Sequence, residues 1–226
     1  MKNIVITGTS RGIGLELVQY FAREGHQVLA LSRNTKPVDN LSLKNVHALS
    51  IDLTQTTNLH EISEFVSNHW SHVDIVIHNA GFLINKPFEE LTQEDFSQVY
   101  HVNVFGVVSL NQTLLPFLVE GSHVVTISSM GGIQGSLKFP GLAAYSSAKG
   151  AVITLSELLA EEYKERNISF NVLALGAVQT EMLEEAFPGY KAPLTASEMA
   201  DYIFNFSLNG NKLYNGKVLQ VSSSTP

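Results

Sequence analysis

Residues 3–14 read NIVITGTSRGIG, a short apolar run that passes directly into a glycine-rich turn. The run at 3–7 predicts a strand covered on both faces, because it is almost continuously apolar. A helix follows the turn, with Ile13, Leu17 and Phe21 at helical spacing. Glycines between a strand and a helix bring backbone N–H groups and a helix N-terminus against a diphosphate. The stretch therefore predicts a dinucleotide site at the start of an α/β fold.

Further apolar runs alternate with helical patterns along the rest of the chain. We expect strands at 27–32, 46–51, 73–78, 123–128, 168–175 and 217–221. Such alternation implies a parallel sheet with right-handed crossovers. We predict an α/β fold, a three-layer doubly wound parallel sheet (Rossmann fold) of about seven strands with helices on both faces. Residues 1–226 are expected to form one dinucleotide-binding and catalytic domain, with a small substrate-loop region at about 176–200.

Composition excludes several classes of protein. The net charge is −7 and the basic residues are scattered, so we expect no nucleic-acid partner. No apolar run approaches the roughly 20 residues of a membrane span, and the first strand leaves no room for a signal peptide. There is no cysteine, which fits a reducing compartment, and the eight histidines show no ligand spacing. We therefore expect a cytoplasmic protein with no membrane segment and no metal.

Two predicted helices, at 95–119 and 144–164, are apolar nearly all round. A helix that is apolar on every side is buried on every side, and a sheet covers only one of them. We therefore expect the chain to associate with itself, as a homodimer or homotetramer, through these two helices.

Tyr145 and Lys149 are four residues apart, so they share one face of the second of these helices. A free tyrosine has a pKa of about 10, and a nearby cation favours the phenolate and lowers that value. The pair is suited to move a proton at a substrate oxygen, although such a pair on its own more often lies on a solvated surface.

The surrounding residues favour the catalytic interpretation. Ser128 and Ser129 end a predicted strand, and residues 79–81, Asn-Ala-Gly, end the preceding one. In an open α/β sheet, the loops at the carboxyl ends of the strands form the ligand crevice. A hydroxyl placed there can hydrogen-bond a substrate carbonyl and its developing alkoxide.

At this point the sequence closely resembles the short-chain dehydrogenase/reductase family, in its single-domain NADP-dependent branch, over nearly its whole length. The resemblance rests on TGTSRGIG at 7–14, Asp52, HNAG at 78–81, HVNVFG at 101–106, TISS at 126–129, YSSAK at 145–149 and NVLALGAVQTEM at 171–182. It implies an oxidoreductase that transfers a hydride between a nicotinamide dinucleotide and a carbonyl or alcohol substrate.

The resemblance also implies a role for individual residues. Tyr145 is the expected general acid/base, with Lys149 as its pKa partner and as a ligand of the nicotinamide ribose. Ser129 is the expected carbonyl-orienting hydroxyl, with Ser128 as the second choice, and Asn103 matches an asparagine that anchors a proton-relay water. The expected cofactor-binding residues are Gly8, Ser10, Arg11, Ile13, Gly14, Arg33, Asp52, Leu53, Asn79, Ala80, Gly81, Tyr145, Lys149, Gly176, Val178 and Thr180.

The end of the second predicted strand indicates which dinucleotide binds. NAD enzymes place a carboxylate there for the adenosine ribose, whereas this chain has Arg33 and no acidic residue. Arg33 and Arg11 can clamp a 2′-phosphate, so we predict NADP(H) in preference to NAD(H). The alternative is two solvated arginines.

The substrate loops are mostly apolar, which predicts a small uncharged carbonyl or alcohol substrate. The expected wall residues are Phe82, Leu83, Met130, Ile133, Leu137, Phe139, Met182, Leu183, Phe187 and Tyr190.

Other functions are weaker fits. Residues 8–12 also satisfy G-x-S-x-G, the pattern of the strand-to-helix turn that carries the nucleophile of a hydrolase, here Ser10. This turn would follow the first strand of the sheet, and the rest of the chain offers no obvious acid and histidine partners for the serine. A protein that only senses the dinucleotide and catalyses no reaction would be expected to lack the tyrosine or the lysine, and this chain has both. An epimerase or dehydratase on the same fold usually carries a larger C-terminal lobe.

The chain departs from the family pattern at several places. His78 stands where asparagine is usual, Leu175 replaces a proline, and the interval from Ser129 to Tyr145 is a few residues longer. The tail at 221–226 lacks a common glycine pair, which leaves dimer or tetramer open.

Overall fold

The structure is a computed structural model that describes residues 1–222, apart from the side chain of Thr56. Within these residues seven parallel strands form one sheet, in the order β3-β2-β1-β4-β5-β6-β9. The strands are β1 (Asn3–Thr7), β2 (Gln27–Ser32), β3 (Val46–Ser50), β4 (Val73–His78), β5 (Leu118–Ser129), β6 (Ser169–Leu175) and β9 (Val218–Val221). The order reverses between β1 and β4, which makes their carboxyl ends the expected ligand crevice. The predicted doubly wound sheet is confirmed.

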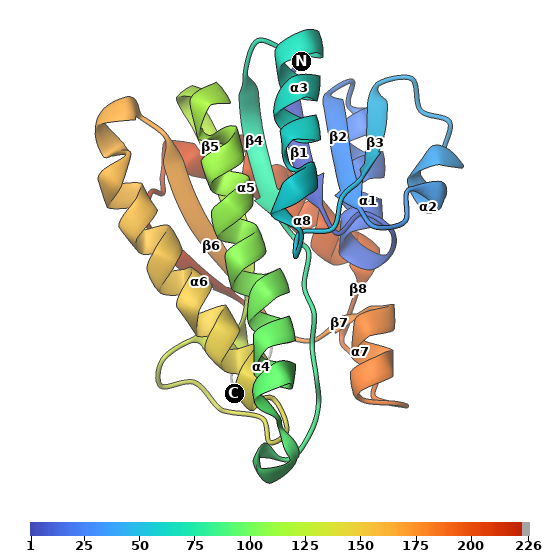
Figure 1. Ribbon diagram of the computed structural model, residues 1–226, viewed down its shortest axis with the longest axis vertical. Coiled ribbons are helices and arrows are strands. Elements are labelled where there is room, and N and C mark those ends of the chain that lie inside the picture. The colour runs from blue at the N-terminus through green and yellow to red at the C-terminus, as the bar shows by residue number, and fades with distance from the viewer. Residues whose placement is uncertain (223–226) are drawn as a thin grey trace.

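Helices cover both faces of this sheet (Figure 1). The α-helices are α1 (Gly12–Arg23), α2 (Lys36–Asp39), α3 (His60–His69), α4 (Gln93–Tyr100), α5 (Gly106–Leu114), α6 (Ala143–Glu162), α7 (Glu181–Ala186) and α8 (Ala196–Asn209). Short 3₁₀ turns are η1 (Thr56–Asn58), η2 (Phe88–Glu90), η4 (Leu115–Phe117), η5 (Met130–Gly132), η6 (Lys164–Arg166) and η7 (Gly210–Lys212). Helices α1 and α8 pack on one face, and α3, α5 and α6 on the other. None of the described helices is long and apolar enough to cross a membrane.

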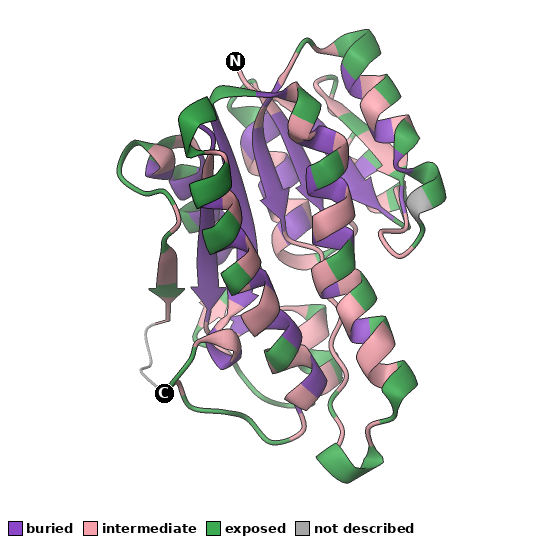
Figure 2. Ribbon diagram, turned by 60° about the vertical axis from the view of Figure 1, so that its left-hand side comes forward, coloured by how far each residue is buried: buried purple, intermediate pink, exposed green. Residues whose placement is uncertain are grey.

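The core consists of one apolar cluster on each face of the sheet. Leu17 and Phe21 of α1 pack with Ile203 of α8 on one side, whereas Ile62 of α3 and Leu110 of α5 pack on the other. The central strands are buried between the two helical layers (Figure 2). Burial on both faces explains why the strands read as continuous apolar runs rather than as alternating ones.

The prediction of one continuous helix at 95–119 is wrong. Helix α4 ends at Tyr100, a π-helical turn (η3, His101–Phe105) follows, then α5, and β5 already begins at Leu118. The Asn103 side chain lies at the break and donates from Nδ2 to the Val99 carbonyl at 2.8 Å. A side chain that bonds a carbonyl of the preceding turn competes with the main-chain ladder and bends the helix.

Within a single chain, the helices at 95–119 and 144–164 leave part of their surface exposed, which is the part that a second copy is expected to cover. Helix α5 exposes Gln112, and α6 exposes Thr154 and Glu157. Two large apolar side chains in these segments are also exposed: Phe105 is 51% exposed and Leu158 is 60% exposed. The outward surface is therefore mixed, with polar positions that the one-dimensional pattern did not reveal.

Two short strands that were not predicted organise the expected substrate-loop region. β7 (Val178–Gln179) pairs in parallel with β8 (Leu194–Thr195). Strands of two residues are too short to show any periodicity in the sequence. Their pairing brings together the two ends of the segment that carries α7.

Candidate active site

The glycine-rich turn lies at the carboxyl end of β1, as predicted. Gly8 has a φ of +72°, and a Cβ at this position would lie 2.7 Å from the Ala80 Cα. Helix α1 starts just after the turn, and its N-cap residue, Arg11, provides no side-chain cap. The Thr9 hydroxyl in the turn is buried and has no hydrogen-bond partner among the described residues. Uncapped N–H groups beside an unpaired hydroxyl fit a bound diphosphate.

The residues that follow β4 hold this turn through hydrogen bonds. Main-chain N–H groups of Asn79 and Ala80 donate to Thr7 Oγ1 at 3.1 and 3.0 Å. The Asn79 side chain donates to the carbonyls of Thr7 and Gly8 at 3.0 and 3.2 Å. Asn79 thus fixes the shape of the turn through its side-chain amide, and the predicted cofactor residues Ser10, Ile13 and Gly14 follow in the turn and in the first turn of α1.

Tyr145 and Lys149 lie in the first two turns of α6. Lys149 is only 4% exposed, and its Nζ donates to the Ile127 carbonyl at 2.8 Å. The same Nζ lies 5.6 Å from the centroid of the Tyr145 ring. Lys149 is therefore buried against a half-buried Tyr145, and the two side chains do not form a pair on a solvated surface.

The expected lowering of the tyrosine pKa is not found. Burial raises the pKa of Tyr145 to about 12 and lowers the pKa of Lys149 to about 8. Lys149 approaches the face of the ring and is itself removed from water, so the loss of solvation outweighs its attraction for the phenolate. Near neutral pH Tyr145 thus keeps its proton and Lys149 its charge, which is the state that donates a proton to a carbonyl oxygen.

The two serines at the end of β5 differ in what their hydroxyls bond. Ser128 is buried, and its Oγ donates to the Lys149 carbonyl at 2.8 Å. Ser129 is half-buried, and its Oγ accepts from the Gly131 N–H at 3.3 Å. The hydroxyl hydrogen of Ser129 has no acceptor among the described residues, so Ser129 is the one able to bond a substrate oxygen.

Asn103 is tied to the loop after β4. Its Nδ2 donates to the Phe82 carbonyl at 2.7 Å, and its Oδ1 accepts from the Phe82 N–H at 3.3 Å. A Cβ at Gly81 would lie 3.4 Å from Asn103 Oδ1, 3.6 Å from Met182 Cε and 3.8 Å from Lys149 Nζ. The π-helical turn, α6 and α7 therefore converge on Gly81, and their side chains come within van der Waals contact of a Cβ at that position.

The two arginines predicted to hold a 2′-phosphate have different surroundings. Arg33 follows β2, is exposed, and its side chain makes no hydrogen bond or ion pair with the described residues. The guanidinium of Arg11 instead forms a two-point ion pair with Glu185 of α7. No sequence pattern linked Glu185 to Arg11, because they are 174 positions apart.

Asp52 and Leu53 follow β3, at the carboxyl edge of the sheet where the glycine-rich turn also lies. Asp52 Oδ1 accepts from the N–H and the hydroxyl of Thr54 at 2.9 and 2.8 Å, which closes a tight turn. Leu53 packs so closely against Gly106 that a Cβ there would lie 2.9 Å from the Leu53 Cβ. These two residues form a wall of the crevice beside α5.

The segment after β6 returns to the glycine-rich turn. Gly176 donates its N–H to the Val221 carbonyl at 2.9 Å, and Val178 is held in β7. Thr180 caps α7, since its hydroxyl accepts from the Leu183 N–H at 3.3 Å. A Cβ at Gly12 would lie 3.5 Å from Thr180 Cγ2. The three residues predicted to contact the nicotinamide thus follow one path from the end of β6 toward the start of α1.

His78, at the end of β4, is held inside the fold by a hydrogen bond to α5. It is buried, and its Nε2 lies 2.9 Å from Asn111 Oδ1 on α5. Burial lowers the pKa of His78 to about 4, so the ring is neutral near pH 7. The described residues contain no group of three or more histidine, aspartate or glutamate side chains that could hold a metal ion.

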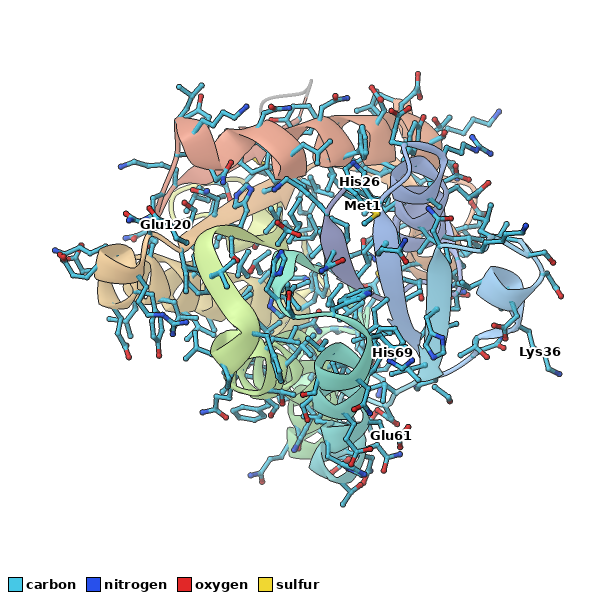
Figure 3. All side chains as sticks on the ribbon, turned by 90° about the horizontal axis from the view of Figure 1, so that it is seen from above. Met1, His26, Lys36, Glu61, His69 and Glu120 are labelled. Carbon is cyan, nitrogen blue, oxygen red and sulfur yellow. The ribbon has the colours of Figure 1, made fainter. Side chains whose placement is uncertain are left out.

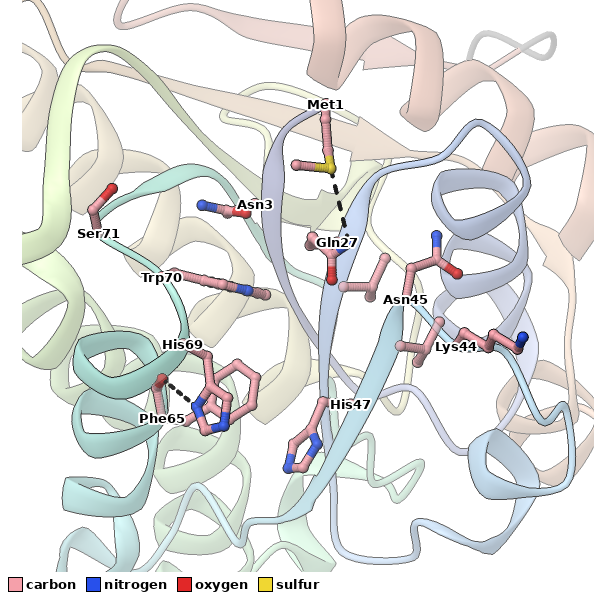
Figure 4. A pocket seen from close by; sticks show the side chains of 12 residues that line it. Met1, Asn3, Gln27, Lys44, Asn45, His47, Phe65, His69, Trp70 and Ser71 are labelled. Atoms are coloured by element: carbon pink, nitrogen blue, oxygen red, sulfur yellow. Dashed lines mark hydrogen bonds between the residues drawn. The ribbon is translucent and has the colours of Figure 1, made fainter.

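A hollow of about 530 Å³ lies at the opposite edge of the sheet, beside the amino ends of β1, β2 and β3. Figure 3 looks down onto this edge, with Met1 and His69 labelled. Rings of His47, Phe65, His69 and Trp70 line the hollow (Figure 4). A smaller hollow, of about 420 Å³, adjoins the first turn of α6 and includes Phe139 and Ser146. Neither of these two hollows is lined by Tyr145, Lys149 or Ser129, and these candidate catalytic residues are identified by their chemistry.

Comparisons with known proteins agree with this geometry. The family model described as short chain dehydrogenase matches residues 2–191. An oxidoreductase of Botryotinia fuckeliana is 32% identical over 182 residues, which are 78% of this chain and 65% of that protein. A 3-oxoacyl-[acyl-carrier-protein] reductase of Thermotoga maritima is 30% identical over 193 residues, 81% of this chain and 77% of that protein.

A solved structure shows the same fold. The short-chain dehydrogenase/reductase of Brucella melitensis superposes with a TM-score of 0.89 at 22% identity, covering 99% of this chain and 96% of that one. The chain belongs to the short-chain dehydrogenase/reductase family. It is an oxidoreductase of the kind that depends on a nicotinamide dinucleotide.

Proposed function

We propose that the protein is an NADPH-dependent reductase of small uncharged carbonyl compounds, and that the reverse reaction oxidises the corresponding alcohols. The observation that carries this proposal is the contact of the buried Lys149 with the Tyr145 ring, together with the uncommitted hydroxyl of Ser129 at the carboxyl end of β5. The nicotinamide, when bound, supplies the hydride to the carbonyl carbon.

The chain's own residues handle the carbonyl oxygen. Ser129 donates a hydrogen bond that orients this oxygen, and Tyr145 gives it a proton as the negative charge develops. The ammonium of Lys149 stabilises the phenolate that remains, which offsets the effect of burial on Tyr145 at the moment of transfer. Asn103, tied to the loop at Gly81, holds the water from which Tyr145 recovers its proton.

The cofactor preference in this proposal rests on Arg33. Its side chain is exposed at the end of β2, where a carboxylate would be needed to bind the adenosine ribose hydroxyls of NAD. A guanidinium at this place favours a 2′-phosphate instead. Arg11 is less well placed for that role than the sequence indicates, because it is paired with Glu185.

Arg33→Asp should weaken the binding of NADPH about tenfold or more. The affinity of the variant for NADH should then approach or exceed its affinity for NADPH. The substitution removes a phosphate ligand and supplies an acceptor for the ribose hydroxyl. Fluorescence titration of both cofactors measures the effect. If the unmodified protein already binds NADH more tightly than NADPH, the proposed cofactor preference is wrong.

Support for the substrate class comes from the side chains around the crevice. Phe82, Leu83, Met182 and Leu183, four of the expected wall residues, are half-buried and uncharged. The Thermotoga relative is named for the reduction of a 3-oxoacyl group, which is also a carbonyl. A panel of aliphatic and aromatic ketones and aldehydes, assayed for oxidation of NADPH, tests this proposal.

We also propose that residues 1–226 act as one catalytic domain in the cytoplasm. The expected cofactor residues range from Gly8 to Thr180 and gather on one continuous sheet edge, which supports a single domain. A chain without cysteine has no need of an oxidising compartment. Cell fractionation of the tagged protein tests the location.

We propose further that at least two copies associate through residues 95–119, which include η3 and α5, and through residues 144–164, which lie mostly in α6. Phe105 of η3 and Leu158 of α6 are large apolar side chains that are exposed in the single chain, and a partner copy would cover them. Twofold symmetry would set the same patch of each copy against the other. Sedimentation at micromolar concentration should give at least a dimer, and Leu158→Lys should weaken it. A single species near 24.8 kDa would refute this interface.

A further inference from the structure

An acidic side of helix α7 lies over the start of α1. Glu181 and Glu185 are four residues apart, so they project from the same side of α7. A Cβ at Gly12 would lie 3.4 Å from Glu181 Oε2, and Glu185 pairs with Arg11. Both carboxylates are therefore close to the turn that is expected to receive the cofactor.

Arg11 and Glu185 form a bidentate ion pair, with two parallel hydrogen bonds. Nη1 donates to Oε1 and Nη2 donates to Oε2, the latter at 2.9 Å. The Glu185 carboxylate raises the pKa of Arg11, and the guanidinium lowers the pKa of Glu185, so both remain charged near neutral pH. A guanidinium fork binds a carboxylate or a phosphate by the same pair of parallel N–H groups. Glu185 and a phosphate are thus alternative partners for this edge of Arg11.

From this geometry we infer that Glu185 sets the strength of NADPH binding. It holds Arg11 in a two-point ion pair, and the 2′-phosphate of the cofactor has to compete with its carboxylate for the guanidinium. The inference rests on the proposed use of NADP(H), and it makes Glu185 a positioning residue that acts through Arg11. NADH has no 2′-phosphate, so this competition for the Arg11 guanidinium is absent from its binding.

Helix α7 keeps its other attachments when Arg11 changes partner. The Ala186 carbonyl accepts from Asn85 Nδ2 at 2.9 Å, and Thr180 still caps the helix. Loss of the Arg11 pair alone therefore leaves α7 in place, and the two ion-pair partners are 46% and 62% exposed. An exposed pair is weak, so the competition is expected to change affinity only several-fold.

The test is Glu185→Gln, which keeps the size of the side chain and removes its charge. NADPH should bind about three- to fivefold more tightly at low ionic strength, whereas NADH should bind as before. Adenosine 2′,5′-bisphosphate should show the same gain in calorimetric titration, and adenosine 5′-monophosphate should show none. These probes lack the nicotinamide, so the measurement does not depend on catalysis.

Glu184→Gln is the matched control, because Glu184 belongs to the same helix but accepts from the Gly189 N–H. Its NADPH affinity should equal that of the unmodified protein. In an Arg11→Gln background, Glu185→Gln should have no further effect. The inference is overturned if Glu185→Gln leaves NADPH affinity unchanged, or if NADPH and NADH tighten equally. An unmodified protein that prefers NADH would instead refute the cofactor preference, while the bisphosphate titration still reports on Arg11 and Glu185.

Discussion

Tyr145→Phe should lower the turnover of any accepted carbonyl substrate by at least about 100-fold, while NADPH binds as before. The phenol keeps its proton near neutral pH, and in the proposed site it is the group that gives this proton to the substrate oxygen. Phenylalanine keeps the ring that packs against α4 but has no proton to donate. General acid catalysis of this kind contributes about 10²–10⁴-fold, which sets the size of the loss.

Tyr163→Phe provides the control for this experiment. Tyr163 follows the other end of α6, so the same hydroxyl is removed from the same helix at a distance from the crevice. Its turnover should match that of the unmodified protein. Near-normal turnover of Tyr145→Phe would mean that another group donates the proton.

Lys149→Met should lower turnover by about 100-fold and change its dependence on pH. Methionine fills similar space in the buried site, but it has no charge to stabilise the phenolate left on Tyr145. In the unmodified protein, burial places the pKa of Lys149 at about 8. The charged form exists below that value, so the rate of carbonyl reduction should fall as the pH rises through about 8.

The methionine variant should lack this alkaline decline, because the titrating group is gone. Turnover at saturating NADPH, measured from about pH 6 to pH 10, gives both profiles. Lys164→Met is a suitable control, since Lys164 is exposed beyond the end of α6 and pairs with Glu161. A decline that persists unchanged in Lys149→Met would assign it to a different residue.

The sequence predicted the fold well because the strands are buried on both faces. Continuous apolar runs such as residues 73–78 have matching bounds in the structure, and glycines at 8 and 14 marked the turn between β1 and α1. Local periodicity failed at Asn103, where a side chain interrupts the helix through a bond to Val99. It also failed at β7, whose two residues are too few to form a pattern.

Parts of the site depend on contacts that no local pattern carries. Adjacent Ser128 and Ser129 look alike in the sequence, and only their hydrogen bonds distinguish them. The pKa of Tyr145 was predicted from its spacing to Lys149, but the direction is set by burial, which depends on the whole fold. The partner of Arg11 comes from a helix near the other end of the chain. The tail at 223–226, considered for a tetramer contact, lies outside the described residues.

Oxidation of NADPH by a panel of ketones and aldehydes tests the central claim most directly. The unmodified protein and Tyr145→Phe are assayed side by side at neutral pH, and the loss of the reduced nicotinamide absorbance is followed. At least one carbonyl compound should be reduced by the unmodified protein, at a rate at least about 100-fold above that of the variant. If no carbonyl is reduced across the panel while NADPH binds, or if the two proteins act equally fast, Tyr145 is not the proton donor of a reductase.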